Sequence, residues 1–599
     1  MKYYIRIIAA LIAMLLLLAA CQTASPSESS SPGSPGTSSS PSSSGTSSSP
    51  SSSGTSSAPS SSGTSSAPGE QGTGAATEQK GVQFPLEEKF TFTIGFRGNV
   101  DYEEQLKNNT LYPLLLELTN VEFEWVHLGD DPIATLNALI AAGNEPDVIY
   151  GSVLNDSQLC DLAYGGFLMP IEDYITDRDL MPNYNTRGLD KMPQALGAMT
   201  MPDGHIYSVS RFDFNVASYL ESPLMINKNW LDQLNMDIPK TIDEFEAMLI
   251  AFRDNDMNGN GNPNDEIPLL IGDGVANPYA HLQALLGFWG IATKNSALDS
   301  YTTVKNSVVS FAPMTQAYRD AIRTISRWYQ EGLIWSEMFT ANTETFNARR
   351  GNDVPLWGAM PSMQMNSYTT TWEDQIIIIP YPDVPGYDKV AYFNPGYYGY
   401  KNTFILTRNA KNPEIIMAWL DMFYSREMSI YARTGLPDDE DTVGAPNRYD
   451  IIDGEYVFYT LSAEDSANLV ANFPTWTQVF GSITYLNSFD DYEDGVVRLV
   501  PVQQMLLKAY NDIYKDFINK EIWPRPYYTA EDNNRANILR TDIFSIVSQY
   551  EARWVTGLSD IDADWDNYIR QLNSAGVQEL VEILQNAYDI YLDAIARLS

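Results

Sequence analysis

The stretch FTFTIGF at residues 90–96 alternates apolar and polar side chains, which is the pattern of a β-strand. Helix-like spacing follows at residues 102–118, and VEFEWV at 121–126 alternates again. Residues 133–142 are apolar at helical spacing, and PDVIY at 146–150 closes the series with another strand. Strands that alternate with helices predict a parallel sheet with covering helices, so we assign the body to the α/β class.

The carboxyl ends of these strands are where a ligand is expected, because open parallel sheets bind ligands beyond that edge. Residues 95–99 and 150–153 should therefore lie near a site. Arg97 and Arg211 follow predicted strand ends, and a guanidinium group there is suited to holding a carboxylate or a pair of hydroxyls. A surface salt bridge is the alternative role for each arginine.

Further signals of secondary structure continue down the chain. Residues 241–244 have the Thr-x-x-Glu spacing of a capping box, which predicts a helix start. Residues 376–379 and 404–406 are short apolar runs that predict buried strands, and a helix is expected from 413 to 424. The last hundred residues are helical in pattern, with an apolar face formed by Trp565, Tyr568, Ile569 and Leu572.

The amino terminus has the pattern of an export signal. Lys2 and Arg6 precede the apolar run 7–18, which is too short to span a bilayer. The run ends in LAAC at Cys21, which resembles a bacterial lipobox, in which the cysteine thiol carries a diacylglycerol. We therefore expect residues 1–20 to be a signal peptide and the membrane to be contacted through the lipid only. An ordinary secretory signal with a chance cysteine is the alternative.

A linker follows at residues 21–80. It consists mainly of Ser, Pro, Gly and Thr, and prolines recur every ninth residue from Pro41 to Pro68. Such a segment cannot bury enough apolar surface to offset its ordering entropy. We expect a flexible tether, for which about 60 residues give a reach of roughly 40 Å. That length suggests the thick wall of a Gram-positive cell.

Charge and cysteine usage limit the possible partners. The formal net charge of -39 repels nucleic acid and anionic lipid headgroups. Cys21 and Cys160 are the two cysteines, so an acylated Cys21 leaves no intramolecular disulfide. We interpret Cys160 as a small buried hydrophobic residue.

The sharpest local motif is DNDMNGNGNPNDE at residues 254–266. Oxygen-bearing side chains at every second position, with glycines at the turn, are what Ca²⁺ coordination requires. One register begins at Asp254, has Gly259 at the turn, and uses Asp254, Asp256, Asn258, Asn262 and Asp265. The other uses Asp256, Asn258, Asn260, the Asn262 carbonyl, Asp265 and Glu266. A metal-free loop of Asx turns is the alternative to both.

Aromatic residues carry the hypothesis about the ligand. The chain has 36 Tyr and 12 Trp, and flat rings stack on the C–H faces of sugars. The candidates lie in loop-like contexts: Trp289, Trp357, Trp476, and Tyr397 and Tyr398 within residues 392–400. Ordinary packing is the alternative for each of them. Trp125, Trp230, Trp419 and Trp565 lie in helix or strand patterns and are expected in the core.

Enzyme signatures are missing from the sequence. His127, His205 and His281 are too far apart for a zinc pair, and no Gly-x-Ser-x-Gly elbow, P-loop or Gly-x-Gly-x-x-Gly motif occurs. We expect no enzymatic activity. Carboxylate pairs are nevertheless abundant among the 76 acidic residues, so residue types alone leave a glycosidase open.

The order of several short motifs resembles one family. They include EPDV at 145–148, GFLMPI at 166–171, DGHIYSV at 203–209, INKNWL at 226–231 and WDNY at 565–568. In this order, behind a lipobox-like leader, the chain resembles the family 1 extracellular solute-binding proteins of ABC importers. It is most similar to their large lipoprotein branch, close to the alginate-binding proteins.

The resemblance implies a type II periplasmic-binding-protein-like fold, in which two α/β lobes hold a ligand in the cleft between them. Within a body of residues 86–599, we expect one lobe at 86–210 and 397–470, and the other at 211–396 and 471–599. Proteins of this kind close on the ligand by hinge bending. The implied partners are a carbohydrate and the subunits of an ABC permease, and we expect a monomer.

The alginate-binding relatives carry a calcium loop of the form Asp-Pro-Asn-Gly-Asn-Gly-Lys-x-Asp-Glu, which matches the register that begins at Asp256. This chain has Met257 in place of the proline and one extra residue before Asp265. The resemblance implies a structural Ca²⁺ at this loop. Two other functions stay open: a surface-tethered carbohydrate-active enzyme, and a peptide-binding or sensing lipoprotein.

Overall fold

The structure is a computed structural model. It describes residues 81–598 apart from 98–102, 105–106, 108–110, 152, 213–219, 263, 273–279, 294–299, 363–371, 394–400, 436–448, 453–454, 459–496 and 499–500. The leader, Cys21 and the linker lie outside the described residues.

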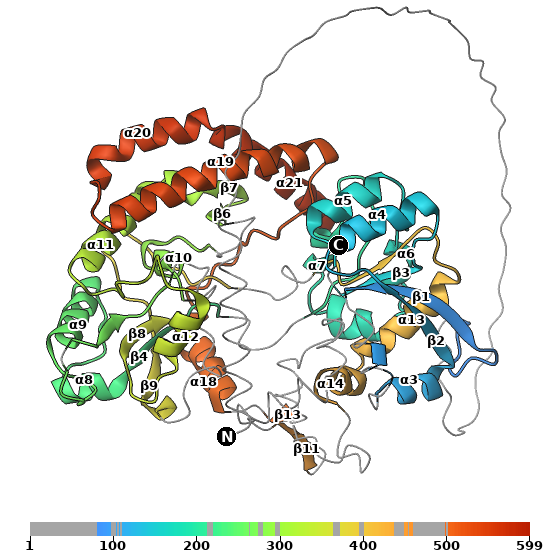
Figure 1. The fold of residues 1–599 in the computed structure, drawn as a ribbon, viewed down its shortest axis with the longest axis horizontal. Helices are drawn as coiled ribbons and strands as arrows, with labels where there is room; N and C mark the ends of the chain where they lie inside the picture. The colour runs from blue at the N-terminus through green and yellow to red at the C-terminus, as the bar shows by residue number, and fades with distance from the viewer. Residues whose placement is uncertain are drawn as a thin grey trace, which may run out of the picture. The chain divides into compact units, whose positions relative to one another are not determined.

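The first sheet has four strands in the order β10-β3-β1-β2, of which Figure 1 labels β3, β1 and β2. β1 (Phe90–Phe96) pairs in parallel with β2 (Val121–His127) and with β3 (Val148–Tyr150). β10 (Phe404–Leu406) adds to β3 in the antiparallel direction. The predicted parallel sheet is confirmed, and it is completed by a strand from far along the chain.

Both faces of the first sheet are covered, as strand alternation requires. On one face Phe92 lies edge-on to Trp419 of α13 (Pro413–Asp421), with ring centroids 5.7 Å apart, and α3 (Leu111–Thr119) packs in the same core. On the other face Ile149 and Ile405 pack with α4 (Pro132–Ala142) and α5 (Asp156–Tyr164). The sheet is therefore the middle of three layers.

A close approach fixes the glycine near the end of β1. A Cβ placed on Gly95 would lie 2.8 Å from Cγ of Pro146. Any larger residue would separate β1 from the segment that leads into β3. Glycine therefore permits the tight packing at the sheet edge where a ligand is expected.

The second sheet has the order β5-β8-β4-β9. β4 (Leu224–Asn227) lies between β8 (Trp357–Pro361) and β9 (Ile376–Ile379) and is antiparallel to both, and β5 (Ile267–Leu269) is parallel to β8. The two sheets are built from alternating parts of the chain, because the chain leaves the first sheet after β3 and returns to it at β10. The two four-stranded sheets are the main sheets of the α/β fold, and the described residues also form a smaller sheet β11-β12-β13 and the pair β6-β7.

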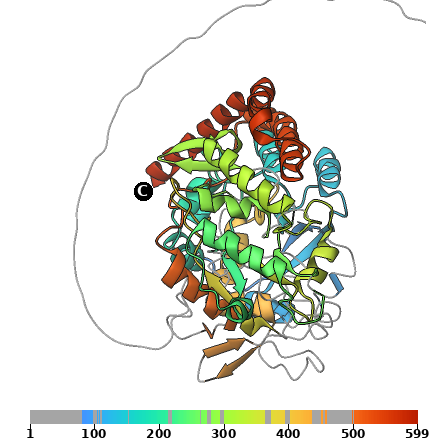
Figure 2. The ribbon, with the colours of Figure 1, turned by 90° about the vertical axis from the view of Figure 1, so that its left-hand side faces the viewer.

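Helix α9 (Ile242–Asp254) covers the second sheet at β5 and β8 (Figure 2). It begins at the predicted capping box, in which the Thr241 hydroxyl accepts from the Glu244 N–H and the Glu244 carboxylate accepts from the Thr241 N–H. The adjoining helices are α8 (Lys228–Leu234) and α11 (Gln316–Gln330). The predicted calcium loop at residues 254–266, called the calcium-type loop below, starts where α9 ends.

Three long helices end the chain: α19 (Ala530–Val555), α20 (Ile561–Ser574) and α21 (Val577–Leu598). The predicted apolar face of α20 is confirmed, with Trp565, Tyr568 and Leu572 buried. α19 contacts α5 and α11, and α21 contacts α7 (Gln194–Met199) and β7 (Val308–Phe311). Because these helices contact elements that accompany both sheets, the lobe boundary predicted at residue 471 stays a prediction.

Other elements of the described chain include α6 (Glu172–Ile175), α10 (Leu282–Leu285), α12 (Thr343–Arg350), α14 (Arg426–Thr434), α18 (Pro501–Ala509), β6 (Thr302–Lys305), β11 (Tyr449–Ile452), β12 (Glu455–Phe458) and β13 (Val497–Arg498). Within the described part of the chain, no helix combines the length and the apolar character needed to cross a membrane. Cys160 is buried, as predicted.

Candidate functional site

The carboxyl edge of the first sheet is where the chain passes between the two sheets. We call residues 208–212, 401–404 and 525–529 the crossing segments. The Gly151 N–H, just beyond β3, donates to the Thr403 carbonyl at 2.8 Å, and the Thr403 hydroxyl donates to the Val209 carbonyl at 2.7 Å. Val209 in turn donates through its N–H to the Phe404 carbonyl at 2.9 Å. Two crossing segments are therefore bound to the edge where the sequence predicts a ligand.

The two predicted arginines both lie at this end of the first sheet. Arg97 follows β1 directly and is exposed. Arg211 is half-buried in a crossing segment. Burial raises the pKa of the Tyr424 phenol, and the nearby charge of Arg211 opposes that rise. Arg97 thus follows a strand, whereas Arg211 follows no strand among the described residues and lies two residues after Val209, which forms an isolated bridge with Phe404. The role of either arginine toward a ligand stays a prediction.

Two of the aromatic residues predicted to contact a ligand, Trp289 and Trp357, are buried. Trp289 is 3% exposed in a short 3-10 helix, η4 (Leu286–Trp289), and Trp357 is 0% exposed in β8. The Trp357 indole N–H donates to the Arg350 carbonyl at 3.1 Å. Both rings pack in the core, which is the packing role that the sequence left open. Tyr397, Tyr398 and Trp476 lie outside the described residues.

The tryptophans predicted as core fit that assignment. Trp230, Trp419 and Trp565 are buried. Trp125 is partly buried and packs against the same core.

The calcium-type loop is organised by the carboxylate of Asp256. Its two oxygens accept from the N–H groups of Gly259 and Gly261 at 2.8 and 2.9 Å. Both glycines have positive φ angles, +71° and +85°, which favour residues without a Cβ. Asp256 therefore closes the turn that the glycine spacing predicted.

Two of the asparagines in the loop, Asn258 and Asn260, connect its halves. Asn258 Oδ1 accepts from the Asn260 N–H at 3.0 Å, and Asn260 Oδ1 accepts from the Asn262 N–H at 2.7 Å. Their Nδ2 groups donate to Asp265 at 3.2 and 2.7 Å. The side chains of Asp256, Asn258, Asn260 and Asp265 are thus drawn into one loop of hydrogen bonds.

Glu266 provides the test of whether this loop fits a cation. Its Oε1 accepts from the Met257 N–H at 2.8 Å, whereas its Oε2 is buried without a hydrogen-bond partner. A buried carboxylate oxygen normally has a partner, so this atom fits a metal ligand. Asp254 instead forms an ion pair with Arg253 at 2.7 Å. These contacts favour the register that begins at Asp256.

The acidic groups alone do not form a metal centre. Among the described residues, no three His, Cys, Asp or Glu side chains are grouped so that they would hold a metal ion. A cation in this loop would therefore depend on asparagine and main-chain oxygens as well, which is the ligand set that Ca²⁺ accepts.

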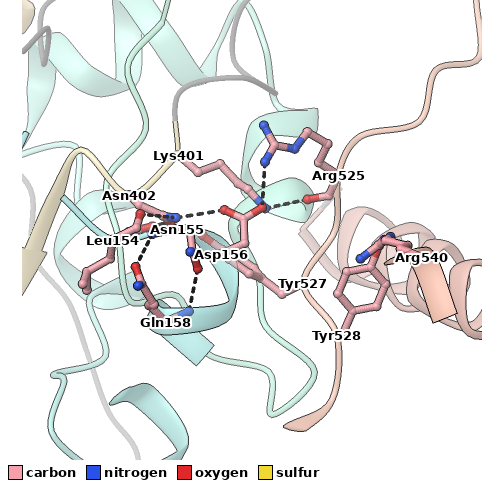
Figure 3. A network of polar contacts seen from close by, with 11 residues as sticks. Leu154, Asn155, Asp156, Gln158, Lys401, Asn402, Arg525, Tyr527, Tyr528 and Arg540 are labelled. Carbon is pink, nitrogen blue, oxygen red and sulfur yellow. Dashed lines mark hydrogen bonds and ion pairs between the residues drawn. The ribbon is translucent and has the colours of Figure 1, made fainter. Parts of the chain in front are cut away.

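Sequence reasoning missed a polar cluster at the crossing segments, centred on Asp156 (Figure 3). Asp156 Oδ1 accepts from Asn402 at 2.9 Å, and its Oδ2 lies 3.4 Å from both Lys401 Nζ and Arg525 Nη2. Asn402 lies 246 residues from Asp156 along the chain, and Arg525 lies 369 residues from it. A local signal exists only at the start of α5, where Asn155 and Gln158 form a capping box.

The two α/β sheets, joined by repeated crossings of the chain, are the architecture of a solute-binding protein. The chain belongs to the bacterial extracellular solute-binding protein family, whose model matches residues 117–429. Among curated proteins, it is 27% identical over 520 residues to the fructooligosaccharide ABC transporter substrate-binding protein FusA of Streptococcus pneumoniae. That match covers 85% of this chain and 92% of FusA.

Solved structures agree on the fold. A solute-binding protein of Bifidobacterium longum infantis, described as HMO-binding and associated with an ABC transporter, has a TM-score of 0.67 at 24% identity, covering 84% of this chain and 99% of that one. FusA in complex with kestose has a TM-score of 0.65 at 23% identity, with the same coverage. A FusA EF-hand mutant has also been solved, and the alginate-binding protein AlgQ2 without calcium has a TM-score of 0.59 at 20% identity over 84% of this chain and 99% of that one. At these identities the similarity concerns the fold.

Proposed function

We propose that this protein captures an oligosaccharide outside the cell and delivers it to the permease of an ABC importer. The observation that carries this proposal is the match to FusA, which extends over 92% of that protein and is therefore not confined to one lobe. A binding protein whose lobes both match a fructooligosaccharide-binding relative is well suited to a saccharide of similar size.

The proposed ligand contacts lie at the carboxyl edge of the first sheet. Arg97 and Arg211 supply planar donors that match the paired hydroxyls or the carboxylate of a sugar. Tyr397, Tyr398 and Trp476 stay in the proposal as stacking partners on the strength of the sequence alone. Trp289 and Trp357 are omitted because their rings are buried.

No chemical step is proposed. The relatives are binding proteins by name, and binding followed by release is enough for transport. Ligand binding would favour a closed arrangement of the lobes because only a difference in affinity between the open and closed forms can shift their populations.

We also propose that the loop at residues 256–266 holds a structural Ca²⁺. Asp256, Asn258, Asn260, Asp265 and Glu266 would supply side-chain oxygens, with a main-chain oxygen from Asn262. The ion would neutralise the carboxylates and fix the end of α9. The buried Glu266 Oε2 without a hydrogen-bond partner supports this proposal, as do the solved FusA EF-hand mutant and the calcium-free AlgQ2.

The leader supports a lipid anchor at Cys21 and a position on the outer face of a Gram-positive cell membrane. The linker of residues 21–80 would then let the binding domain move away from that surface. We propose that the protein acts as a monomer and that the membrane is contacted by the lipid alone.

A thermal-shift screen against kestose, nystose and a panel of plant and microbial oligosaccharides tests the sugar assignment. We expect one class of saccharide to raise the melting temperature, with no product detected by chromatography after prolonged incubation. Arg211→Gln should weaken this binding, whereas Arg178→Gln, at an exposed ion pair with Asp190, should not. Hydrolysis products would instead identify an enzyme, and a response to peptides alone would replace the sugar.

A further inference from the structure

The cluster around Asp156 joins all three crossing segments. Lys401 and Asn402 belong to the segment that enters β10, and Arg525 and Tyr527 belong to the one that leads to α19. The third segment takes part through Ser208, whose hydroxyl donates to Asn402 Oδ1 at 3.3 Å. Asn402 Oδ1 also accepts from the Tyr527 hydroxyl at 2.6 Å.

Lys401 is the most buried charge of the cluster, with a side chain only 2% exposed. Its ammonium group donates to the Arg525 carbonyl at 2.5 Å and lies 3.6 Å from the centroid of the Tyr527 ring. Asp156, at 18% side-chain exposure, is its carboxylate partner. A buried ammonium group needs such a partner, so a change at Asp156 acts directly on both segments that Lys401 contacts.

Two residues of the cluster, Asn402 and Arg525, have a constrained backbone conformation. Asn402 has a φ of 65° and Arg525 a φ of 50°, both in the left-handed region. Asparagine tolerates this conformation, whereas arginine adopts it rarely and at a cost. The side-chain contacts of Arg525 to Asp156 therefore help to hold a strained bend in a crossing segment (Figure 3).

The electrostatics agree with this geometry. Burial raises the pKa of Asp156, but the charges of Lys401 and Arg525 and the hydrogen bond from Asn402 outweigh it, so the pKa lies below its usual value. Asp156 also occupies the first position of α5, where the helix dipole favours a negative charge. Asp156 is thus held in its charged form, and its carboxylate is the group that Lys401, Arg525 and Asn402 contact.

We infer that Asp156 is a positioning residue whose charge holds the three crossing segments together and thereby sets the balance between open and closed arrangements of the two lobes. The inference rests on the proposed function, because the lobes need to move only if the protein captures and releases a ligand. It deepens that proposal by naming the group that controls the movement, and ligand affinity would follow this balance.

The test measures lobe separation in the protein without added ligand. Spin labels are placed at Glu117→Cys on α3 and Asn229→Cys on α8, both exposed positions, in the full chain with Cys21→Ser. Cys160 stays unlabelled because it is buried. Double electron–electron resonance then gives the distance distribution for Asp156→Asn, for Arg525→Gln and for the double variant. Asp190→Asn, which removes one charge from an exposed ion pair with Arg178, is the matched control.

We expect Asp156→Asn and Arg525→Gln each to change the ratio of the distance populations by about fivefold or more. The effect of the double variant should be smaller than the sum of the two single effects, because both single changes remove the Asp156–Arg525 contact. The control should match the unsubstituted chain. If Asp156→Asn does not fold, Arg525→Gln alone decides the outcome.

An unchanged distribution in a folded Asp156→Asn variant would overturn the inference. So would a double variant whose effect equals the sum of the two single changes. Because no saccharide is added, a failed sugar assignment leaves this result unaffected. The two proposals can therefore fail separately.

Discussion

Replacing Glu551 by glutamine should alter how stability depends on pH. Glu551 lies in α19 and is buried among tyrosines. The Tyr301 hydroxyl donates to its two oxygens at 2.7 and 2.8 Å, and the Tyr318 hydroxyl donates to Oε1 at 2.6 Å. Both of these partners are neutral, so the carboxylate is stabilised by hydrogen bonds while burial penalises its charge.

The magnitude follows from the pKa of this group. Burial raises the pKa of Glu551 from 4.5 to about 6, against the two tyrosine hydrogen bonds, which lower it. The folded protein therefore binds this proton more tightly than the unfolded chain does. The stabilisation is fully present below pH 4.5 and is lost as the pH rises through 6. The loss amounts to about 2 kcal/mol, and glutamine, which carries no charge, would not show it.

The assay is urea unfolding of the native chain and of Glu551→Gln between pH 4 and pH 7.5. The difference in the free energy of unfolding, native minus variant, should fall by about 2 kcal/mol across this range. Exposed Glu117→Gln on α3 serves as the control and should give a flat difference. A flat difference for Glu551→Gln, or one that rises with pH, would refute the reasoning.

Three further predictions concern the loop and the cysteines. Chelator should lower the melting temperature and Ca²⁺ should restore it; Glu266→Gln should lose this response while Asp254→Asn keeps it, and elemental analysis that finds no metal would remove the calcium proposal. Cys21→Ser should move the protein from the membrane fraction to the medium, as followed by immunoblotting, and unchanged fractionation would exclude the lipid anchor. In that Cys21→Ser chain, Cys160 should react with a thiol reagent only after unfolding, because burial raises the pKa of its thiol to about 12. A rapid reaction of the folded chain would show that this side chain is accessible.

Local patterns predicted much of the first sheet and the start of α9. The alternation at residues 90–96 and the capping box at Thr241 each involve only a few neighbouring residues. Both can therefore be recognised from the local sequence alone. β10 was predicted as a strand, but its place beside β3 was not, because strand pairing over that separation leaves no local trace.

The candidate site was predicted less completely. Trp289 and Trp357 lie in loop-like sequence contexts, yet tertiary packing encloses both rings. The partners of Asp156 were missed because each belongs to a different segment of the chain, and only folding brings them together. By contrast, the position of Arg97 follows from where β1 ends, which is a topological rule.

The antiparallel strand β10 also has a consequence for synthesis and export. β3 is a strand of three residues. One of its edges pairs with residues 404–406 of β10, which are synthesised much later. Because the chain is synthesised from its amino terminus, this apolar strand edge stays unpaired until about two thirds of the polypeptide has been made. Unpaired strand edges favour pairing with other chains, so the chain is most exposed to such pairing before the late strand completes the sheet.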